Sequence, residues 1–307
     1  MRAFIFPGQG SQAVGMGAAL ADASRAARDV FDEVDEALGQ NLSRLMREGP
    51  EDELKLTENA QPAIMANSIA VLRAWGVRLP DVADFVAGHS LGEYSALCAA
   101  SSFDLATAAK LLKLRGRAMQ QAVPVGQGAM AALLGADLAL AQKIAEAAAQ
   151  GEVCTVANDN DPTQVVISGH KGAIDRAIEL AREMGAKRAL PLPVSAPFHC
   201  PLMQPAAEAM ADALSYVVLE APAVPLYANV TAQPATDPDA IRTQLVEQVT
   251  GMVRWRESVA NLFDAGVDEF VELGGKVLGG MVKRITPDAK VTSVVTIEDV
   301  EALAREF

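Results

Sequence analysis

The segment VAGHSLGEYSAL, residues 86–97, constrains the fold of this chain more than any other. An apolar run of strand type stops at Gly88, Ser90 follows between two glycines, and an apolar helical pattern resumes after Gly92. G-x-S-x-G between a strand and a helix is the pattern of a nucleophile elbow, a sharp turn that raises the serine above a sheet. The glycines avoid steric clashes in the turn, and the backbone N–H of Leu91 at the helix N-terminus can face a developing oxyanion. The segment therefore predicts a serine nucleophile at the turn between a strand and the N-terminus of a helix.

Strand-length apolar runs alternate with amphipathic helical stretches along most of the chain, which favours a parallel sheet with helices on both faces. The expected strands of this sheet span residues 2–6, 85–87, 225–229, 269–273 and 291–297. The expected helices include residues 24–38, 60–75, 105–122, 239–249 and 255–265. This order predicts the α/β fold class, with a large α/β-hydrolase-like domain built on a parallel sheet.

The middle of the chain follows a different order, β-α-β-β-α-β, which is the split pattern of a ferredoxin-like unit. Its expected elements span residues 128–134, 138–149, 153–157, 164–168, 173–184 and 188–192. Proline and glycine residues on either side mark hinges. We therefore expect a small ferredoxin-like domain, residues 126–196, inserted into a large catalytic domain of residues 1–125 and 197–307. A cleft between the two domains is the expected place for a ligand.

Composition and charge exclude several classes of function. The 307 residues are 50% hydrophobic, enough for a large core, and the formal net charge is -13. Such a surface repels nucleic acid and anionic membranes, and no run of Lys and Arg offsets it. The apolar stretch at the start is too short for a signal peptide, and no run of about 18 uncharged apolar residues occurs. We expect a cytoplasmic protein without nucleic acid or membrane partners.

The three cysteines, Cys98, Cys154 and Cys200, show no C-x-x-C spacing. They predict neither a disulfide framework nor a structural zinc site. Cys200 directly follows His199, but a catalytic cysteine needs a positioned base, which adjacency in sequence does not supply. We interpret Cys200 as structural.

A serine nucleophile needs a base, and the only histidines are His89, His170 and His199. His89 is adjacent to Ser90 in the turn and is expected to point away from the attack direction, while His170 lies in a polar turn of the inserted domain. His199 follows VSAPF, where the chain returns to the large domain, so we expect it at the cleft. The order of serine before histidine agrees with elbow enzymes. A structural role is the alternative for His199.

Several motifs resemble, in the correct order and over the whole chain, those of the malonyl-CoA:acyl carrier protein transacylases of fatty acid synthesis. The related acyltransferase domains of polyketide synthases share them. The motifs are FPGQGSQ at 6–12, TENAQPAI at 57–64, GHSLGEY at 88–94, LRGRAMQ at 114–120, ANDNDPTQVVISG at 157–169, VSAPFH at 194–199 and YANVTA at 227–232.

The resemblance implies a role for each catalytic position. Ser90 is the nucleophile that takes the acyl group, and His199 is the base that activates it. No acidic third member is implied, because the backbone carbonyl of Gln248 holds the histidine, so that Gln248 matters for its main chain. A carbonyl can fix the imidazole tautomer as a carboxylate does. The backbone N–H groups of Gln9 and Leu91 are the implied oxyanion donors.

Arg115 lies in the helical stretch DLATAAKLLKLRGRAMQQA, where a solvated surface arginine is the ordinary interpretation. The resemblance implies instead that Arg115 binds the free carboxylate of the malonyl group, for which its planar two-pronged donor is well suited. An acetyl group would leave the buried guanidinium unpaired, so such a site can reject it by about 10⁴ or more.

Four further residues resemble substrate-binding residues of the family. Phe198 matches the malonyl-type members, where a bulky ring disfavours a branched methylmalonyl group. Core packing is the alternative for Phe198, since one methyl is worth only about 1–3 kcal/mol. Gln61, Asn158 and Gln164 resemble cleft residues, and turn or capping roles are their alternatives.

The implied reaction is a ping-pong transfer of the malonyl group from malonyl-CoA to the phosphopantetheine thiol of acyl carrier protein, through a malonyl-serine ester. Coenzyme A and phosphopantetheine are substrate groups, so we expect no cofactor and no metal. Acyl carrier proteins are acidic, so docking on this acidic chain needs a local basic patch. We expect a monomer. The candidate docking residues are Lys113, Arg117, Lys187, Arg188, Arg254, Arg256, Lys276, Lys283 and Arg284.

Two other classes of function compete with this interpretation. A serine hydrolase, such as a thioesterase or lipase, would share the elbow and the histidine but not Arg115 or the inserted domain. A non-catalytic carrier-binding module would not need Ser90 and His199 together. The motifs leave open whether the product enters fatty acid or polyketide synthesis.

Overall fold

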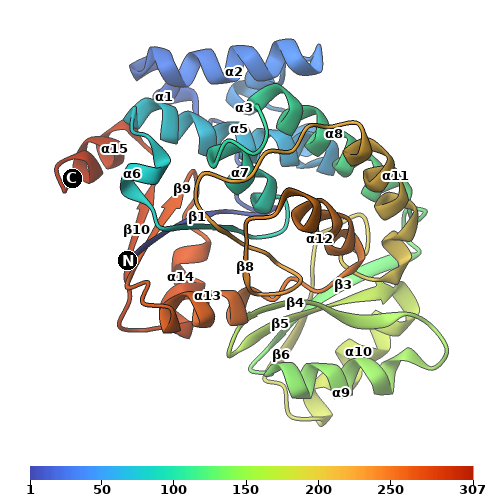
Figure 1. The fold of residues 1–307 in the computed structure, drawn as a ribbon. Coiled ribbons are helices and arrows are strands. Elements are labelled where there is room, and N and C mark those ends of the chain that lie inside the picture. Colours follow the sequence, from blue (N-terminus) through green and yellow to red (C-terminus); the bar gives the residue numbers. More distant parts are fainter. Residues whose placement is uncertain (307) are drawn as a thin grey trace.

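The computed structural model describes residues 1–306, and within them the chain forms two separate sheets (Figure 1). The large sheet has the strand order β10-β9-β1-β2-β7-β8. All neighbours are parallel except β7 and β8, which pair antiparallel. The strands are β1 (Arg2–Phe6), β2 (Phe85–Gly88), β7 (Leu226–Tyr227), β8 (Pro234–Ala235), β9 (Glu269–Leu273) and β10 (Lys290–Val294).

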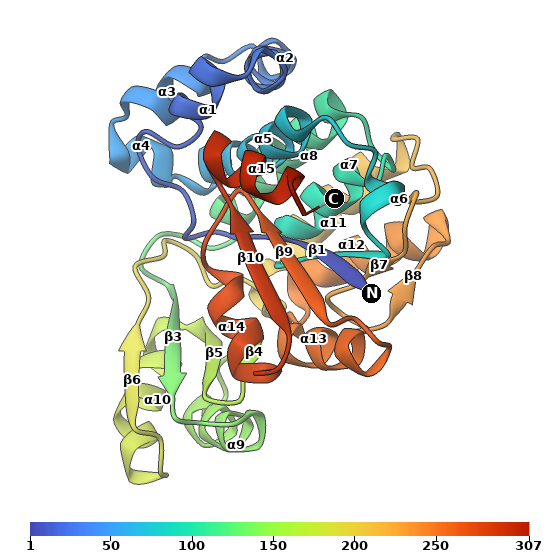
Figure 2. The ribbon, with the colours of Figure 1, turned by 90° about the vertical axis from the view of Figure 1, so that its left-hand side faces the viewer.

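Alternate side chains of β1 enter two different cores, because successive residues of a strand point to opposite faces. Phe4 and Phe6 pack on the side of α5 (Thr57–Trp75), α7 (Gly92–Ala99) and α8 (Leu105–Gln121). Ala3 and Ile5 pack on the side of α13 (Trp255–Asp264) and α14 (Leu278–Ile285). The structure thus confirms a largely parallel sheet with helices on both faces (Figure 2).

An outer layer of helices covers α5 at the top of Figure 1. In α2 (Arg25–Leu38) the buried residues Ala27, Val30, Phe31 and Val34 recur at helical spacing, so one face of the helix packs inward. The other helices outside the small sheet are α1 (Ala18–Ala23), α3 (Leu42–Glu48), α4 (Glu51–Lys55), α6 (Leu79–Val82), the 3-10 turn η1 (Pro201–Met203), α11 (Gln204–Ser215), α12 (Pro238–Thr250) and α15 (Ile297–Ala304).

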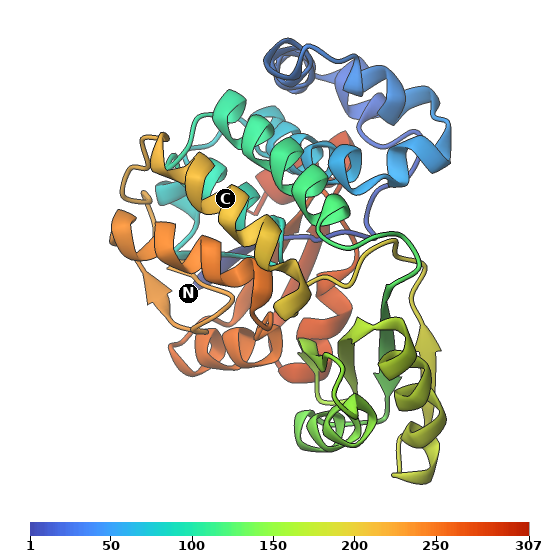
Figure 3. The same ribbon diagram turned by 90° about the vertical axis from the view of Figure 1, so that its right-hand side faces the viewer.

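The small sheet is antiparallel, with the order β4-β5-β3-β6, and it stands apart from the large sheet in Figure 3. The chain order is the expected β-α-β-β-α-β, and the sheet and its two helices share a core of their own. The domain boundaries at 125/126 and 196/197 stay a prediction. The elements are β3 (Gly128–Leu134), α9 (Leu138–Ala149), β4 (Cys154–Asp161), β5 (Gln164–His170), α10 (Lys171–Glu183) and β6 (Arg188–Pro191).

Strand β4 joins the small sheet to the large body. Its Asn158 forms a parallel bridge with Val253, just before α13. Two carboxylates of β4 that are almost completely buried form ion pairs with arginines of the large body, Asp159 with Arg256 at 2.8 Å and Asp161 with Arg284 at 2.8 Å. These contacts fix the orientation of β4 and of the residues it contributes to the space between the sheets.

Two expected strands end earlier than the sequence suggested. The strand expected at 291–297 is β10, which ends at Val294, because Thr296 caps the following helix and accepts from the backbone N–H of Asp299. The strand expected at 225–229 pairs only at Leu226–Tyr227. The strand expected at 153–157 is longer, since β4 continues through two register shifts to Asp161.

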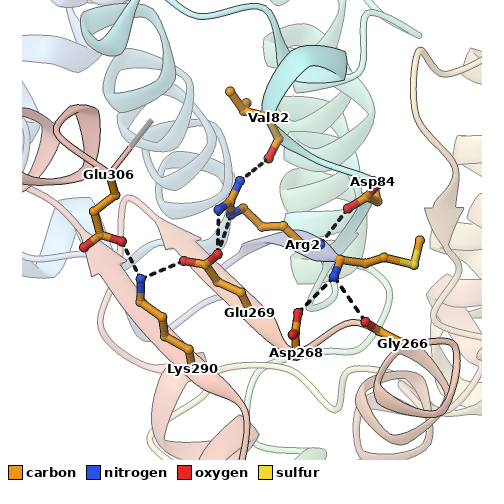
Figure 4. Close-up of polar contacts among 9 residues, drawn as sticks. Arg2, Val82, Asp84, Gly266, Asp268, Glu269, Lys290 and Glu306 are labelled. Atoms are coloured by element: carbon orange, nitrogen blue, oxygen red, sulfur yellow. Dashed lines mark hydrogen bonds and ion pairs between the residues drawn. The ribbon is translucent and has the colours of Figure 1, made fainter.

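A cluster of ion pairs joins the first residues of β1, β9 and β10, at the ends of these strands that lie away from Ser90 (Figure 4). The guanidinium of Arg2 on β1 pairs with Glu269 on β9 at 2.6 Å. Lys290 on β10 lies 3.0 Å from the same carboxylate and also contacts Glu306. No helix within residues 1–306 is long and apolar enough to cross a membrane.

Replacement of Arg284 by Met tests the junction at β4. The buried Asp161 carboxylate would then keep only the backbone N–H and hydroxyl of Thr163 as donors, both at 2.9 Å. We expect the free energy of unfolding, measured in urea, to fall by about 2 kcal/mol, because an uncompensated buried charge is costly and Arg284 itself is partly exposed. Arg44→Met, which breaks an exposed pair with Glu48, should cost less than about 1 kcal/mol. Equal losses in both variants would contradict this prediction.

Candidate active site

Ser90 occupies the turn between β2 and α7, with a φ of 55°, in a region that non-glycine residues rarely adopt. A Cβ atom on Gly88 would lie 1.9 Å from the backbone of Gly92. A Cβ atom on Gly92 would lie 2.2 Å from the carbonyl oxygen of Phe6 on β1. The two glycines therefore let the turn pack directly against α7 and β1, where any side chain would displace the serine.

His199 lies in the segment between β6 and η1, and its ring reaches the turn from the other direction. Its Nε2 is 2.8 Å from Ser90 Oγ, and its Nδ1 is 2.9 Å from the backbone carbonyl oxygen of Gln248 in α12. A carbonyl can only accept, so Nδ1 carries the proton and donates to it. Nε2 is then the free acceptor that faces the serine hydroxyl, which is the arrangement a general base requires.

Burial and a nearby positive charge keep His199 neutral. Burial, and to a smaller extent the Arg115 guanidinium, lower the pKa of the imidazole to about 3, although the bond to the Gln248 carbonyl opposes the shift. At neutral pH the ring can therefore accept a proton but does not hold one in the resting state. The imidazolium that would form during proton transfer faces Arg115 without a carboxylate on Nδ1, so it is stabilised less than in a serine, histidine and aspartate triad.

Two backbone N–H groups near Ser90 have no acceptor among residues 1–306. Leu91 immediately precedes α7, and Gln9 follows β1 in the loop that begins at Pro7. A Cβ atom on Gly8 would lie 2.8 Å from the carbonyl oxygen of His89, so this loop packs directly on the elbow. Both N–H groups are therefore available to an oxyanion, which is compatible with the role that the family resemblance implies for Gln9 and Leu91.

Arg115 extends from α8 into the protein, and it is 1% exposed, so it is not the solvated arginine of the ordinary interpretation. Its guanidinium donates to Gln61 Oε1 at 2.8 Å, to Gln248 Oε1 at 2.7 Å and to Ser90 Oγ at 3.2 Å. It also lies 5.7 Å from the ring centroid of Tyr94. This guanidinium is buried, contacts Ser90 Oγ and has only neutral hydrogen-bond partners, so it is available to an anion beside the serine.

The side chain of Gln248 takes part in the site, whereas the sequence analysis assigned a role only to its main chain. Besides accepting from Arg115, its amide donates to the backbone carbonyl of Ser90 at 3.0 Å and to the carboxylate of Glu93. Asn229 is a second residue without an earlier role, and its Oδ1 accepts from the Ser90 backbone N–H at 2.8 Å. Gln248 has this wider role because its place in α12 brings it into contact with His199, Arg115 and Ser90.

Glu93 and Asn229 lay inside the quoted motifs, and two sequence signals could have identified them. Glu93 is a carboxylate in an otherwise apolar helix, three residues after the nucleophile. Asn229 follows a strand, and strand ends of a parallel sheet gather polar groups at one edge. Both side chains are buried, and burial raises the pKa of Glu93 to about 7 although its bonds to Gln248 and Asn229 and the charge of Arg115 oppose the shift.

A cavity of about 390 Å³ lies between the two sheets, and its wall brings together all the predicted site residues except Gln248, which contacts the wall residue Arg115. Phe198 lines it beside His199. Asn158 and Gln164 line it from β4 and β5, so Asn158 is a strand residue rather than a turn residue. The predicted site residues on its wall are Gln9, Gln61, Ser90, Leu91, Arg115, Asn158, Gln164, Phe198 and His199.

The other histidines and Cys200 do not contact Ser90 Oγ. His89 also lines the cavity, but its Nε2 is 2.8 Å from Asn160 Oδ1 on β4, so His89 joins the elbow to the small sheet. His170 accepts from the Val153 backbone N–H at 2.9 Å within the small sheet. Cys200 is buried, its thiol donates to a backbone carbonyl, and burial raises its pKa, which agrees with a structural role.

Among residues 1–306, no group of three or more His, Cys, Asp or Glu side chains could hold a metal ion. Five of the nine candidate docking cations already form ion pairs with carboxylates of this chain, namely Lys113, Arg117, Arg254, Arg256 and Arg284. The remaining four, Lys187, Arg188, Lys276 and Lys283, form no ion pair within the described residues.

Comparisons with known proteins agree with this geometry. A model of the acyl transferase domain matches residues 3–282. The malonyl CoA-acyl carrier protein transacylase of Escherichia coli strain K12 is 48% identical over 284 residues, 92% of this chain and 92% of that protein. The acyl-carrier-protein-S-malonyltransferase structure from Bartonella henselae has a TM-score of 0.97 at 52% identity, and the match covers 99% of this chain and 98% of that one. A malonyl-transacylase solved in complex with a type II PKS acyl-carrier protein has a TM-score of 0.97 at 40% identity, with 100% and 99% covered.

The low pKa of His199 is testable by proton NMR of the imidazole C2–H signals. An ordinary histidine titrates near pH 6.5. We expect one signal, assigned by its loss in His199→Gln, to remain at the position of the neutral ring from pH 8 to pH 5, because burial and Arg115 disfavour the charged form. A full titration of that signal between pH 6 and 7 would contradict the prediction.

The raised pKa of Glu93 predicts a pH dependence of stability. The unfolded chain loses this proton near pH 4.5, whereas the folded chain keeps it until about pH 7. The folded state therefore binds more protons in this window, and the Glu93 contribution to stability is lost as pH rises through it. Relative to Glu93→Gln, the wild type should lose on the order of 3 kcal/mol between pH 4.5 and 7, at about 1.4 kcal/mol per pKa unit. Parallel curves of unfolding free energy against pH would refute the assignment.

Proposed function

The chain belongs to the acyl transferase domain family, and we propose that it transfers the malonyl group of malonyl-CoA to the phosphopantetheine thiol of acyl carrier protein. The transfer would supply extender units for fatty acid synthesis. The observation that carries this proposal is the buried guanidinium of Arg115, 3.2 Å from the Ser90 hydroxyl. A serine and histidine pair alone serves many acyl transfers, whereas a buried cation at the nucleophile selects an acyl group with a negative charge of its own.

The proposed first half-reaction forms a malonyl-serine ester. Ser90 Oγ attacks the thioester carbonyl and its proton passes to His199 Nε2, while the backbone N–H groups of Gln9 and Leu91 bind the oxyanion. The tetrahedral intermediate then collapses, the bond to sulfur breaks, and His199 returns the proton to the leaving thiol of coenzyme A. In the second half-reaction the phosphopantetheine thiol gives its proton to His199 and its sulfur attacks the ester carbonyl. The bond from this carbon to Ser90 Oγ then breaks, and His199 returns the proton to Oγ, which restores the serine hydroxyl.

Arg115 would bind the malonyl carboxylate during both steps. In the structure two of its nitrogens donate to the neutral amide oxygens of Gln61 and Gln248, and its Nε has no hydrogen-bond partner within the described residues. A carboxylate could therefore bind beside these contacts, and an acetyl group offers no acceptor for the remaining donors. Phe198 would limit room for a methyl branch, an effect of about 1–3 kcal/mol at most.

We propose that the two sheets belong to two domains. The large sheet would belong to an α/β-hydrolase-like domain of residues 1–125 and 197–307, and the small sheet to an inserted ferredoxin-like domain of residues 126–196. The cavity between them would hold the acyl group away from water while the ester awaits the carrier. We also propose that this protein acts as a monomer. The candidates for docking acyl carrier protein are the four cations that form no ion pair within the described residues, namely Lys187, Arg188, Lys276 and Lys283.

Intact-mass spectrometry tests the proposed reaction. Incubation with malonyl-CoA should add one malonyl group to the wild type and none to Ser90→Ala, and the adduct should disappear when carrier protein with its phosphopantetheine arm is added. Loss of the adduct to water at the same rate without the carrier would favour a serine hydrolase instead.

Replacement of Arg115 by Lys tests the proposed selectivity. Lysine keeps the charge but cannot form the two-pronged contact. We expect kcat/KM for malonyl-CoA to fall by about 10²-fold or more, and that for acetyl-CoA to change by less than about tenfold. Arg44→Met, which changes an exposed arginine outside the cavity, serves as a control for general damage. Equal losses with both acyl groups would oppose a carboxylate-binding role.

A further inference from the structure

Glu93 is a buried carboxylate at the active site that the proposed reaction does not use. It lies in the first turn of α7 and is 1% exposed. Its two oxygens accept from two different donors, the backbone N–H of Asn229 at 3.2 Å and the side-chain amide of Gln248. A buried carboxylate is costly unless it is paired and hydrogen-bonded, so its presence here calls for a role.

Glu93 and Arg115 bind opposite ends of the same amide. A carboxylate can only accept hydrogen bonds, and a guanidinium can only donate them. The Gln248 amide therefore has one orientation that satisfies both neighbours, with Nε2 toward Glu93 and Oε1 toward Arg115 at 2.7 Å. The other orientation would place the amide NH₂ against the donors of Arg115 and its oxygen against the carboxylate.

The interposed amide also keeps Arg115 available. A carboxylate in direct contact would occupy the guanidinium and compete with an acyl carboxylate, whereas a single buried cation without a counter-charge would be costly. Among residues 1–306, Arg115 forms no direct ion pair, and Glu93 supplies the opposite charge from one side chain away. The guanidinium is thus compensated, but its nearest contacts are neutral and leave its Nε without a partner within the described residues.

The same carboxylate supports the nucleophile through Asn229. The backbone N–H of Asn229 donates to Glu93, and its side chain holds the elbow by accepting from the Ser90 N–H at 2.8 Å and donating to the Gly88 carbonyl at 2.7 Å. Glu93 therefore connects the residue that holds Ser90 with the residue that holds Arg115.

We propose that Glu93 is a positioning residue which, through the Gln248 amide, orients the Arg115 guanidinium for an acyl group that carries its own carboxylate. The inference rests on the proposed function and deepens it, because it assigns part of the acyl selectivity to a side chain that touches neither substrate nor nucleophile.

Glu93→Gln tests the proposal at pH 8, where the carboxylate of the wild type is ionised. The variant keeps the shape but has one acceptor oxygen for two donors, so one bond is lost and the Gln248 amide is no longer held in one orientation. We expect KM for malonyl-CoA to rise by about tenfold to a hundredfold, the range for one hydrogen bond to a charged group. The ratio of kcat/KM for malonyl-CoA to that for acetyl-CoA should fall by the same factor.

Glu269→Gln is the matched control, since Glu269 is a mostly buried carboxylate at the beginning of β9, where it pairs with Arg2 rather than with a residue of the site (Figure 4). It should leave the ratio unchanged. A folded Glu93→Gln variant with the wild-type ratio would overturn the proposal, whatever its thermal stability.

Gln248→Met keeps the test decisive should Glu93→Gln fail to fold. It removes both ends of the amide but retains the backbone carbonyl that binds His199, so it should lower the ratio by about the same factor. In the double variant the two effects should not add, because both act through one contact. Full additivity, or an unchanged ratio in Gln248→Met, would overturn the proposal.

Failure of the wild type to form a malonyl adduct would instead count against the proposed function itself.

Discussion

The buried positive charge of Arg115 organises the surroundings of Ser90. It disfavours protonation of His199, it is bound by the amide oxygens of Gln61 and Gln248, and its opposite charge lies on Glu93, one side chain away. Each of these neighbours would be costly to bury by itself, and together they satisfy one another. The polar interior of this site is therefore one connected network rather than a set of separate catalytic groups.

A second constraint is backbone conformation. Ser90 and His199 both have positive φ values, 55° and 56°, although neither is a glycine. Such conformations persist only where the surroundings hold them. At Ser90 the holding groups are Asn229 on the backbone N–H and Gln248 on the carbonyl. The strained backbone of Ser90 is thus held by Asn229 and Gln248, and Gln248 also connects it to Arg115.

Much of this could be predicted because local patterns determine it. The elbow, the parallel strands at β1, β2 and β9, and the β-α-β-β-α-β order all follow from short-range spacing of apolar and turn residues. Strand ends were predicted less well. Residues 291–297 look like one apolar strand, yet the local helix cap at Thr296 ends it at Val294. The strand expected at 153–157 continues beyond Ala157 because Asn158 pairs with Val166 and Val253, the latter a contact distant in sequence.

The sequence by itself determined which residues are candidates for the chemistry and in what order they occur, because each motif is a local arrangement of a few side chains. Only the tertiary structure decided how they are coupled. Gln248 lies 155 residues from Glu93 and 133 from Arg115, and no local pattern indicates that its amide binds both. Such a bridge exists because α12 packs its glutamine between α7 and α8, and the direction of each hydrogen bond then follows from which groups donate and which accept.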